Sequence, residues 1–97
     1  FLAYQSNHVI FRRVVSRHDY HDPFPGWGRQ SATFAMYETT NFSLQNVISI
    51  DSGLEDYSNG QLWGGVWFEN NANVETSGKV LGSIFLNLRG LAALNDP

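Results

Sequence analysis

The chain has 97 residues, of which 42% are hydrophobic and 14% aromatic, and its formal net charge is −3 at pH 7. This composition excludes wholesale disorder, because the apolar side chains suffice for a core. The length predicts one β-rich domain over residues 1–97. Charged residues make up only 15% of the chain, below the roughly 25% usual for soluble domains. A surface with so little charge repels neighbouring molecules weakly, which favours contact with other protein subunits.

Several classes of function lose support at this level. There is no cysteine, so disulfide and thiolate chemistry are excluded, and no apolar run approaches the ~18 residues of a membrane span. Residues 1–30 hold four arginines and two aspartates, whereas residues 31–97 hold seven acidic residues against Lys79 and Arg89. We expect contact between these basic and acidic regions rather than nucleic-acid binding. Phe1 in place of Met suggests a processed N-terminus.

The N-terminal third of the chain divides into an ambiguous segment and a loop. Apolar residues in 1–17 recur at helical spacing, yet four residues of 9–15 are β-branched, so we expect a strand over 8–16. Prolines and glycines predict a loop over 18–31. Trp27 in this loop either packs against the core or contacts a ligand.

The middle of the chain shows clearer strand patterns. Residues 32–40 and 42–51 alternate apolar and polar side chains, which predicts two strands. Asn46 disturbs the second alternation, and we interpret it as a β-bulge. Residues 52–60 predict an acidic loop that ends in an Asn-Gly turn.

The segment 61–70 carries two of the three tryptophans. On a strand, Trp63 and Trp67 share one face about 13 Å apart, and the glycines between them allow another chain or side chain to approach closely. Such a face is either buried in the core or an interface, or it is a platform for sugar rings. Gln61 and Asn70 would then supply neutral hydrogen-bonding groups.

The C-terminal region 79–94 again fits a strand or a helix. Its glycines weaken the helix, so we expect a strand over 80–89 and a short helical or extended end over 91–94. No internal repeat is apparent. Five or six short strands separated by turns predict an all-β fold, a small antiparallel barrel or sandwich with a short C-terminal helix as an option.

His18, His21 and Asp22 are candidate metal ligands, because imidazole and carboxylate groups bind zinc and iron. A zinc site needs three protein ligands in fixed geometry, and this proline-rich loop offers no helix to align them. We therefore assign no metal, no catalytic residue and no cofactor.

These observations favour a non-enzymatic assembly module, a subunit of a larger homo- or hetero-oligomer such as a virion, a surface filament or a complex. We expect an extracellular or virion-surface location, with other copies of the chain as partners. The interface would include the following residues: Trp27, Gln61, Trp63, Trp67 and Asn70. One alternative is a secreted carbohydrate-binding module that uses an exposed tryptophan face. A second alternative is a small metal-dependent enzyme at the His18/His21 loop.

Overall fold

The computed structural model describes residues 1–21, 31–54, 63–70 and 75–96. These residues form strands only, and no helix occurs among them. The strands are β1 (Leu2–Tyr4), β2 (Ile10–Arg12), β3 (Val15–Arg17), β4 (Tyr20–His21), β5 (Ser31–Tyr37), β6 (Phe42–Gln45), β7 (Ile48–Ile50), β8 (Gly53–Leu54), β9 (Trp63–Glu69), β10 (Gly78–Leu81), β11 (Ile84–Leu86) and β12 (Leu91–Asp96).

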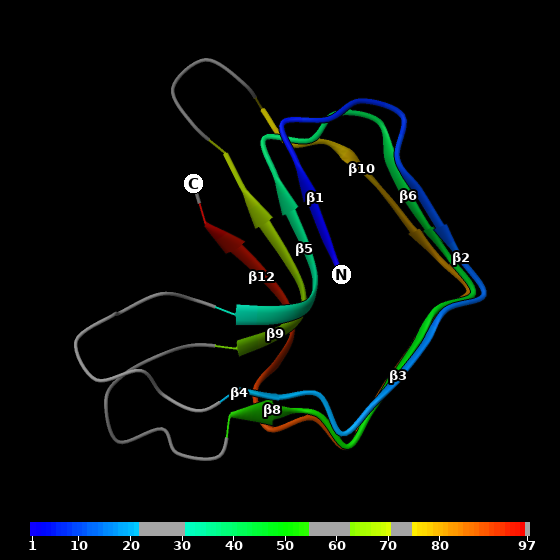
Figure 1. The fold of residues 1–97 in the computed structure, drawn as a ribbon, viewed down its shortest axis with the longest axis vertical. Helices are drawn as coiled ribbons and strands as arrows, with labels where there is room; N and C mark the ends of the chain where they lie inside the picture. The colour runs from blue at the N-terminus through cyan, green and yellow to red at the C-terminus, as the bar shows by residue number, and fades with distance from the viewer. Residues whose placement is uncertain (22–30, 55–62, 71–74, 97) are drawn as a thin grey trace.

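The strands form four parallel sheets, in the orders β1-β5-β9-β12, β2-β6-β10, β3-β7-β11 and β4-β8. The chain visits these sheets in the same order on each turn, so it winds into a parallel β-helix (Figure 1). The first coil comprises β1 to β4, the middle coil β5 to β8, and the third coil β9 to β11. The dimensions are 35 × 31 × 14 Å. The short dimension lies along the coil axis and holds about three strand spacings of 4.8 Å.

The antiparallel barrel or sandwich expected from the sequence is therefore wrong. Every strand pair between described residues is parallel. The described turn residues Asn46 and Gly82 lie at corners of a coil rather than in hairpins. Parallel partners lie a full coil apart because parallel strands cannot be joined by a tight turn. The C-terminal segment forms β12, not a helix.

The corners explain why single predicted strands are in fact pairs of strands. Arg13, Asn46 and Gly82 have positive φ values of 53°, 51° and 57°, and each separates a strand of the second sheet from a strand of the third. Asn46 is thus a corner residue and not a bulge. The strands predicted over 8–16 and 80–89 are each broken at such a corner.

The coils give the chain a structural repeat, which the sequence shows only faintly. Arg12 Nε donates to Gln45 Oε1 at 2.8 Å, 33 positions along the chain. Asn87 Nδ2 donates to Asp51 Oδ1 at 2.7 Å, 36 positions back. Residues from three successive coils therefore stack in columns along the axis.

The core lies inside the middle coil, because its strands are covered by a coil on each side. Phe34, Met36, Leu44 and Val47 are almost completely buried. Thr33 and Ser49 share a buried hydroxyl hydrogen bond of 2.9 Å. In the end coils, the side chains at equivalent positions are covered by a coil on one side only. Val80, in register with Leu44, is 40% exposed.

Candidate functional site

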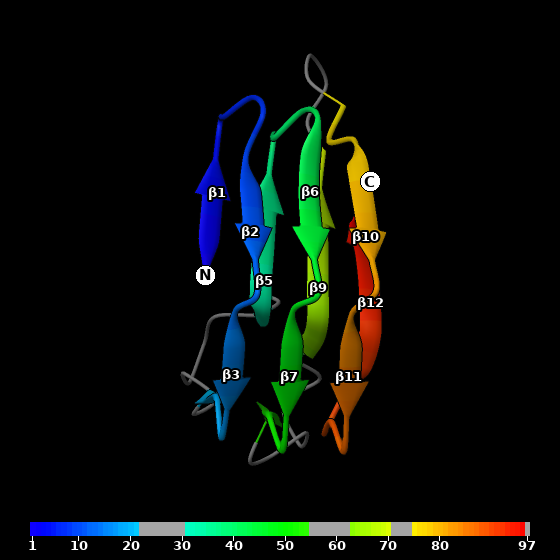
Figure 2. The ribbon, with the colours of Figure 1, turned by 90° about the vertical axis from the view of Figure 1, so that its right-hand side faces the viewer.

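The two ends of the coil expose unpaired strand edges. Figure 2 shows β2 and β3 at one end of the molecule and β10 and β11 at the other. Ser43 N–H donates to the Val9 carbonyl, and Arg13 N–H donates to the Gln45 carbonyl. Because hydrogen-bonding direction alternates along a strand, the N–H groups of Ile10 and Arg12 point away from β6. No described strand lies beyond them.

The same pattern holds on β3 and at the opposite end. Ile48 N–H donates to the Val14 carbonyl and His18 N–H to the Ile50 carbonyl, so the Val15 N–H points to the open edge. Asn46 N–H donates to the Leu81 carbonyl on β10. The backbone N–H and C=O groups of alternate β10 residues therefore also face an open edge.

Apolar side chains accompany these edges. Ile10 and Val15 in the first coil are 56% and 62% exposed, and Ile84 and Leu86 in the third coil are 52% and 56% exposed. Open edges flanked by apolar side chains are sites where another chain can add a strand.

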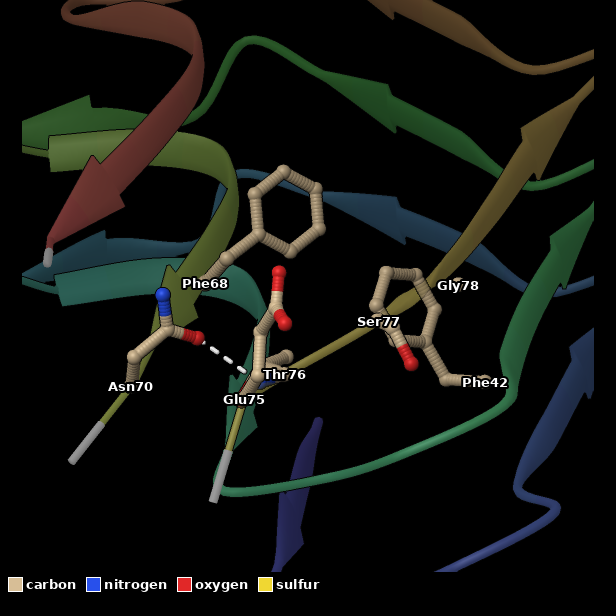
Figure 3. Close-up of a pocket in the computed structure, with 7 residues that line it drawn as sticks. All are labelled: Phe42, Phe68, Asn70, Glu75, Thr76, Ser77 and Gly78. Carbon is tan, nitrogen blue, oxygen red and sulfur yellow. Dashed lines mark hydrogen bonds between the residues drawn. The ribbon is translucent and has the colours of Figure 1, made fainter. Parts of the chain in front are cut away.

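A pocket of about 530 Å³ lies in the third coil, beside the end of β9 and the start of β10. Tyr37 pairs with Glu69 and Phe42 pairs with Gly78. Tyr37 and Phe42 are five positions apart, whereas Glu69 and Gly78 are nine positions apart. The third coil therefore carries four extra residues at this corner. The pocket is lined by Phe42, Phe68, Asn70, Glu75, Thr76, Ser77 and Gly78 (Figure 3).

The pocket has an aromatic wall and a single carboxylate. The rings of Phe42 and Phe68 stack with centroids 5.3 Å apart. Gly78 is required beside them, because a Cβ there would lie 2.4 Å from the Phe42 ring. Figure 3 shows the Glu75 carboxylate directed into the space beside the rings.

Hydrogen bonds between side chains and the backbone hold the pocket wall in place. Thr76 N–H donates to Asn70 Oδ1 at 2.7 Å, and the Thr76 hydroxyl donates to the Glu69 carbonyl. Asn70 thus bonds within the chain at this corner, and its place at an interface stays a prediction. The described lining contains one carboxylate and no histidine.

The tryptophan strand is present as β9. Trp67 is half-buried, and its indole N–H is buried without a hydrogen-bond partner. Gly65 admits the Phe85 ring, since a Cβ there would lie 2.4 Å from Phe85 Cδ1. This agrees with the expected close approach of a side chain at the glycines. Trp63 begins β9, whereas Trp27 and Gln61 lie outside the described residues, so the glycan-binding alternative stays a prediction.

The histidine candidates are not brought together as a metal site in the part of the chain that is described. His18 lies at a corner, with Nε2 3.5 Å from Asp51 Oδ2, and His21 ends β4. Among the described residues no three His, Asp or Glu side chains gather around a common point. Asp22 lies outside those residues, so the metal-dependent alternative stays a prediction.

Asp51 is the centre of an exposed corner cluster. The Asn87 hydrogen bond, with help from the Arg17 and His18 charges, holds the pKa of Asp51 below its usual value despite partial desolvation. Arg17 Nε lies 3.6 Å from Asp51 Oδ2. The cluster ties the three coils together at one corner.

A second column of side chains crosses the first sheet. The rings of Tyr4 and Tyr37 stack with centroids 4.9 Å apart. The Glu69 carboxylate, in register with Tyr37, raises the pKa of that phenol together with desolvation and Glu38. Apart from Asn70, the residues at the coil ends and in the pocket were not predicted as site residues, because their significance depends on which strands lack a neighbour.

The fold defines the chain as a short parallel β-helix with open ends. Comparison with protein-family models, with curated proteins and with solved structures gave no match. No helix in the described part of the chain is long and apolar enough to cross a membrane.

Proposed function

We propose that this chain is a non-enzymatic assembly module that joins to other copies of itself end to end, through the open edges of its first and third coils. The observation that carries the proposal is the pair of matching ends. Both end coils stack on the same middle coil, since Ile10 and Lys79 each pair with Ser43, and Val15 and Ile84 each pair with Ile48. The two ends therefore follow one outline along the second and third sheets, away from the corner where the third coil carries four extra residues.

Strand addition at these edges would bury two kinds of group. It would pair the free N–H groups of Ile10 and Val15, and it would cover the exposed apolar side chains beside them. Main-chain hydrogen bonds supply affinity in this mode, and side chains supply register. A repeating module that stacks along its axis forms a filament or a shaft, and repeat architectures bury a continuous core in the same way.

Charge favours a head-to-tail arrangement over contact between like ends. The first coil carries Arg12, Arg13 and Arg17 against one described acid, Asp19. The described part of the chain from residue 63 onward holds three acidic residues against two basic ones. Opposite charge steers association, whereas two basic ends repel each other.

The test is the solution mass over a concentration series, for the native chain and for a double variant, Ile10→Pro with Val15→Pro. Proline removes two N–H groups that bond to nothing within the coil, and edge positions tolerate proline. We expect association to weaken by about 30-fold, because two lost hydrogen bonds contribute ~2 kcal/mol.

The matched control is Ile10→Thr with Val15→Thr, which keeps β-branching and both N–H groups. The control should associate more strongly than the proline variant, while both keep the circular dichroism spectrum of the native chain. A native chain that stays at 10.9 kDa at every concentration would overturn the proposal. Equal association of the proline and threonine variants would remove the first-coil edge from the interface.

A further inference from the structure

We infer that β12 occupies the place that β1 of a second copy needs, so that head-to-tail association requires β12 to leave the edge of β9. This inference rests on the proposed function and adds a built-in control of assembly to it.

The registers of the first sheet carry the inference. Ala3 pairs with Met36, Met36 pairs with Phe68, and Phe68 pairs with Asn95. The first sheet therefore has four strands where the second and third sheets have three. β12 already begins a fourth coil on the first sheet, above the edge of the third coil.

A second copy that continues the coil would place its β2 on β10 and its β3 on β11. In the second copy β1 precedes β2 in the same coil. Ala3 of that copy would therefore take the position beside β9 that Asn95 already occupies. Neighbouring strands lie about 4.8 Å apart, and two strands cannot share one position. A second copy that instead paired its β1 with β12 would leave the edges of β10 and β11 unpaired.

The last two residues of β12 are polar, as expected of a strand that ends the coil. Asn95 holds the register position of Ala3, Met36 and Phe68, three apolar residues. A polar residue at the last position of an apolar column is typical of a capping repeat. Figure 2 shows β12 at the same end of the molecule as β10, opposite β1.

The sharpest test compares proline at two adjacent positions of β12. Glu38 N–H donates to the Glu69 carbonyl, so Phe68 directs its groups toward β12 by the alternation of bonding along a strand. With Phe68 paired to Asn95, the Leu94 N–H points to β9 and the Ala93 N–H points to the open edge. Leu94→Pro loosens β12, and Ala93→Pro is the matched control.

We expect Leu94→Pro to raise the association constant by about fivefold, as the loss of one hydrogen bond predicts, while Ala93→Pro leaves it within about twofold of native. In the native chain, amide hydrogen exchange over residues 91–96 should speed up on association, which tests the release of β12 without any substitution.

The outcomes separate this inference from the proposed function. A native chain that associates, with Leu94→Pro equal to it or weaker and with slow exchange over 91–96 in the assembly, would overturn the role of β12 alone. Native and Leu94→Pro chains that both stay monomeric would overturn the proposed function as well.

Discussion

Shortening Leu44 in the middle coil tests whether coils stack as described. Leu44 is fully buried on β6 and pairs with Phe11 on one side and Val80 on the other. Leu44→Ala should lower the free energy of unfolding by about 3 kcal/mol, within the 2–5 kcal/mol range of such core truncations. An unfolding entropy of ~0.2 kcal/mol/K for a chain of this length converts this loss to a fall in Tm of about 15 °C.

The control is the same chemical change on an exposed strand. Leu86 on β11 is 56% exposed, so Leu86→Ala should cost less than about 0.5 kcal/mol. Urea unfolding followed by tryptophan fluorescence, at a concentration where the chain is monomeric, measures both. A Leu44→Ala cost below about 1 kcal/mol, or equal costs for the two variants, would refute the stacking of three coils around this residue.

Three further predictions address the pairing register of β2 and β6, the close contact of Gly65 with Phe85, and the stability of the chain at acidic pH. Ile10→Cys with Ser43→Cys should form an intramolecular disulfide, because these residues are Cα partners on β2 and β6 and adjacent parallel strands lie within disulfide reach. A mass shift on oxidation checks this prediction. Free thiols after oxidation would contradict the register. Gly65→Ala should destabilise the chain by about 1–3 kcal/mol through collision with Phe85, and an unchanged Tm would contradict that approach. The pKa of Asp51 is lowered from 3.8 in the folded chain, so its contribution to stability is present above pH 3.8 and is lost as pH falls through the folded value. Tm measured against pH should therefore fall less steeply below pH 4 in Asp51→Asn, and identical slopes would contradict the cluster.

Local patterns predicted where strands occur but not how they pair. The alternation over 32–40 and 61–70 matches β5 and β9, because β-branched and aromatic residues favour a pleated, half-buried surface whatever the neighbouring strand. Pairing direction depends on the corners. Arg13 adopts a positive φ, although this conformation is typical of glycine and asparagine.

A signal of the repeat was present in the sequence. Phe, Tyr, Val and Ser recur 33 positions apart, at Phe1 and Phe34, Tyr4 and Tyr37, Val14 and Val47, and Ser16 and Ser49. The period is faint because it is not constant. The spacing is 32 from β5 to β9, and the four extra residues in the third coil make it 36 from β6 to β10.

The candidate site was harder to predict than the strands. Ile10, Val15 and Ile84 resemble ordinary strand residues, and only their place in an end coil makes them exposed. Tryptophans are large apolar residues that a sequence shows directly, whereas unpaired backbone edges have no sequence signature.

The most direct test of end-to-end assembly is oxidation of the double variant Ile10→Cys with Lys79→Cys. Both residues pair with Ser43, so within one molecule they lie two strand spacings apart, about 9.6 Å, beyond the ~7 Å reach of a disulfide. In a head-to-tail stack, Ile10 of one copy lies opposite Lys79 of the next. The account predicts a ladder of reducible oligomers from the double variant and none from either single variant. Monomers only, or dimers from the single variants, would contradict it.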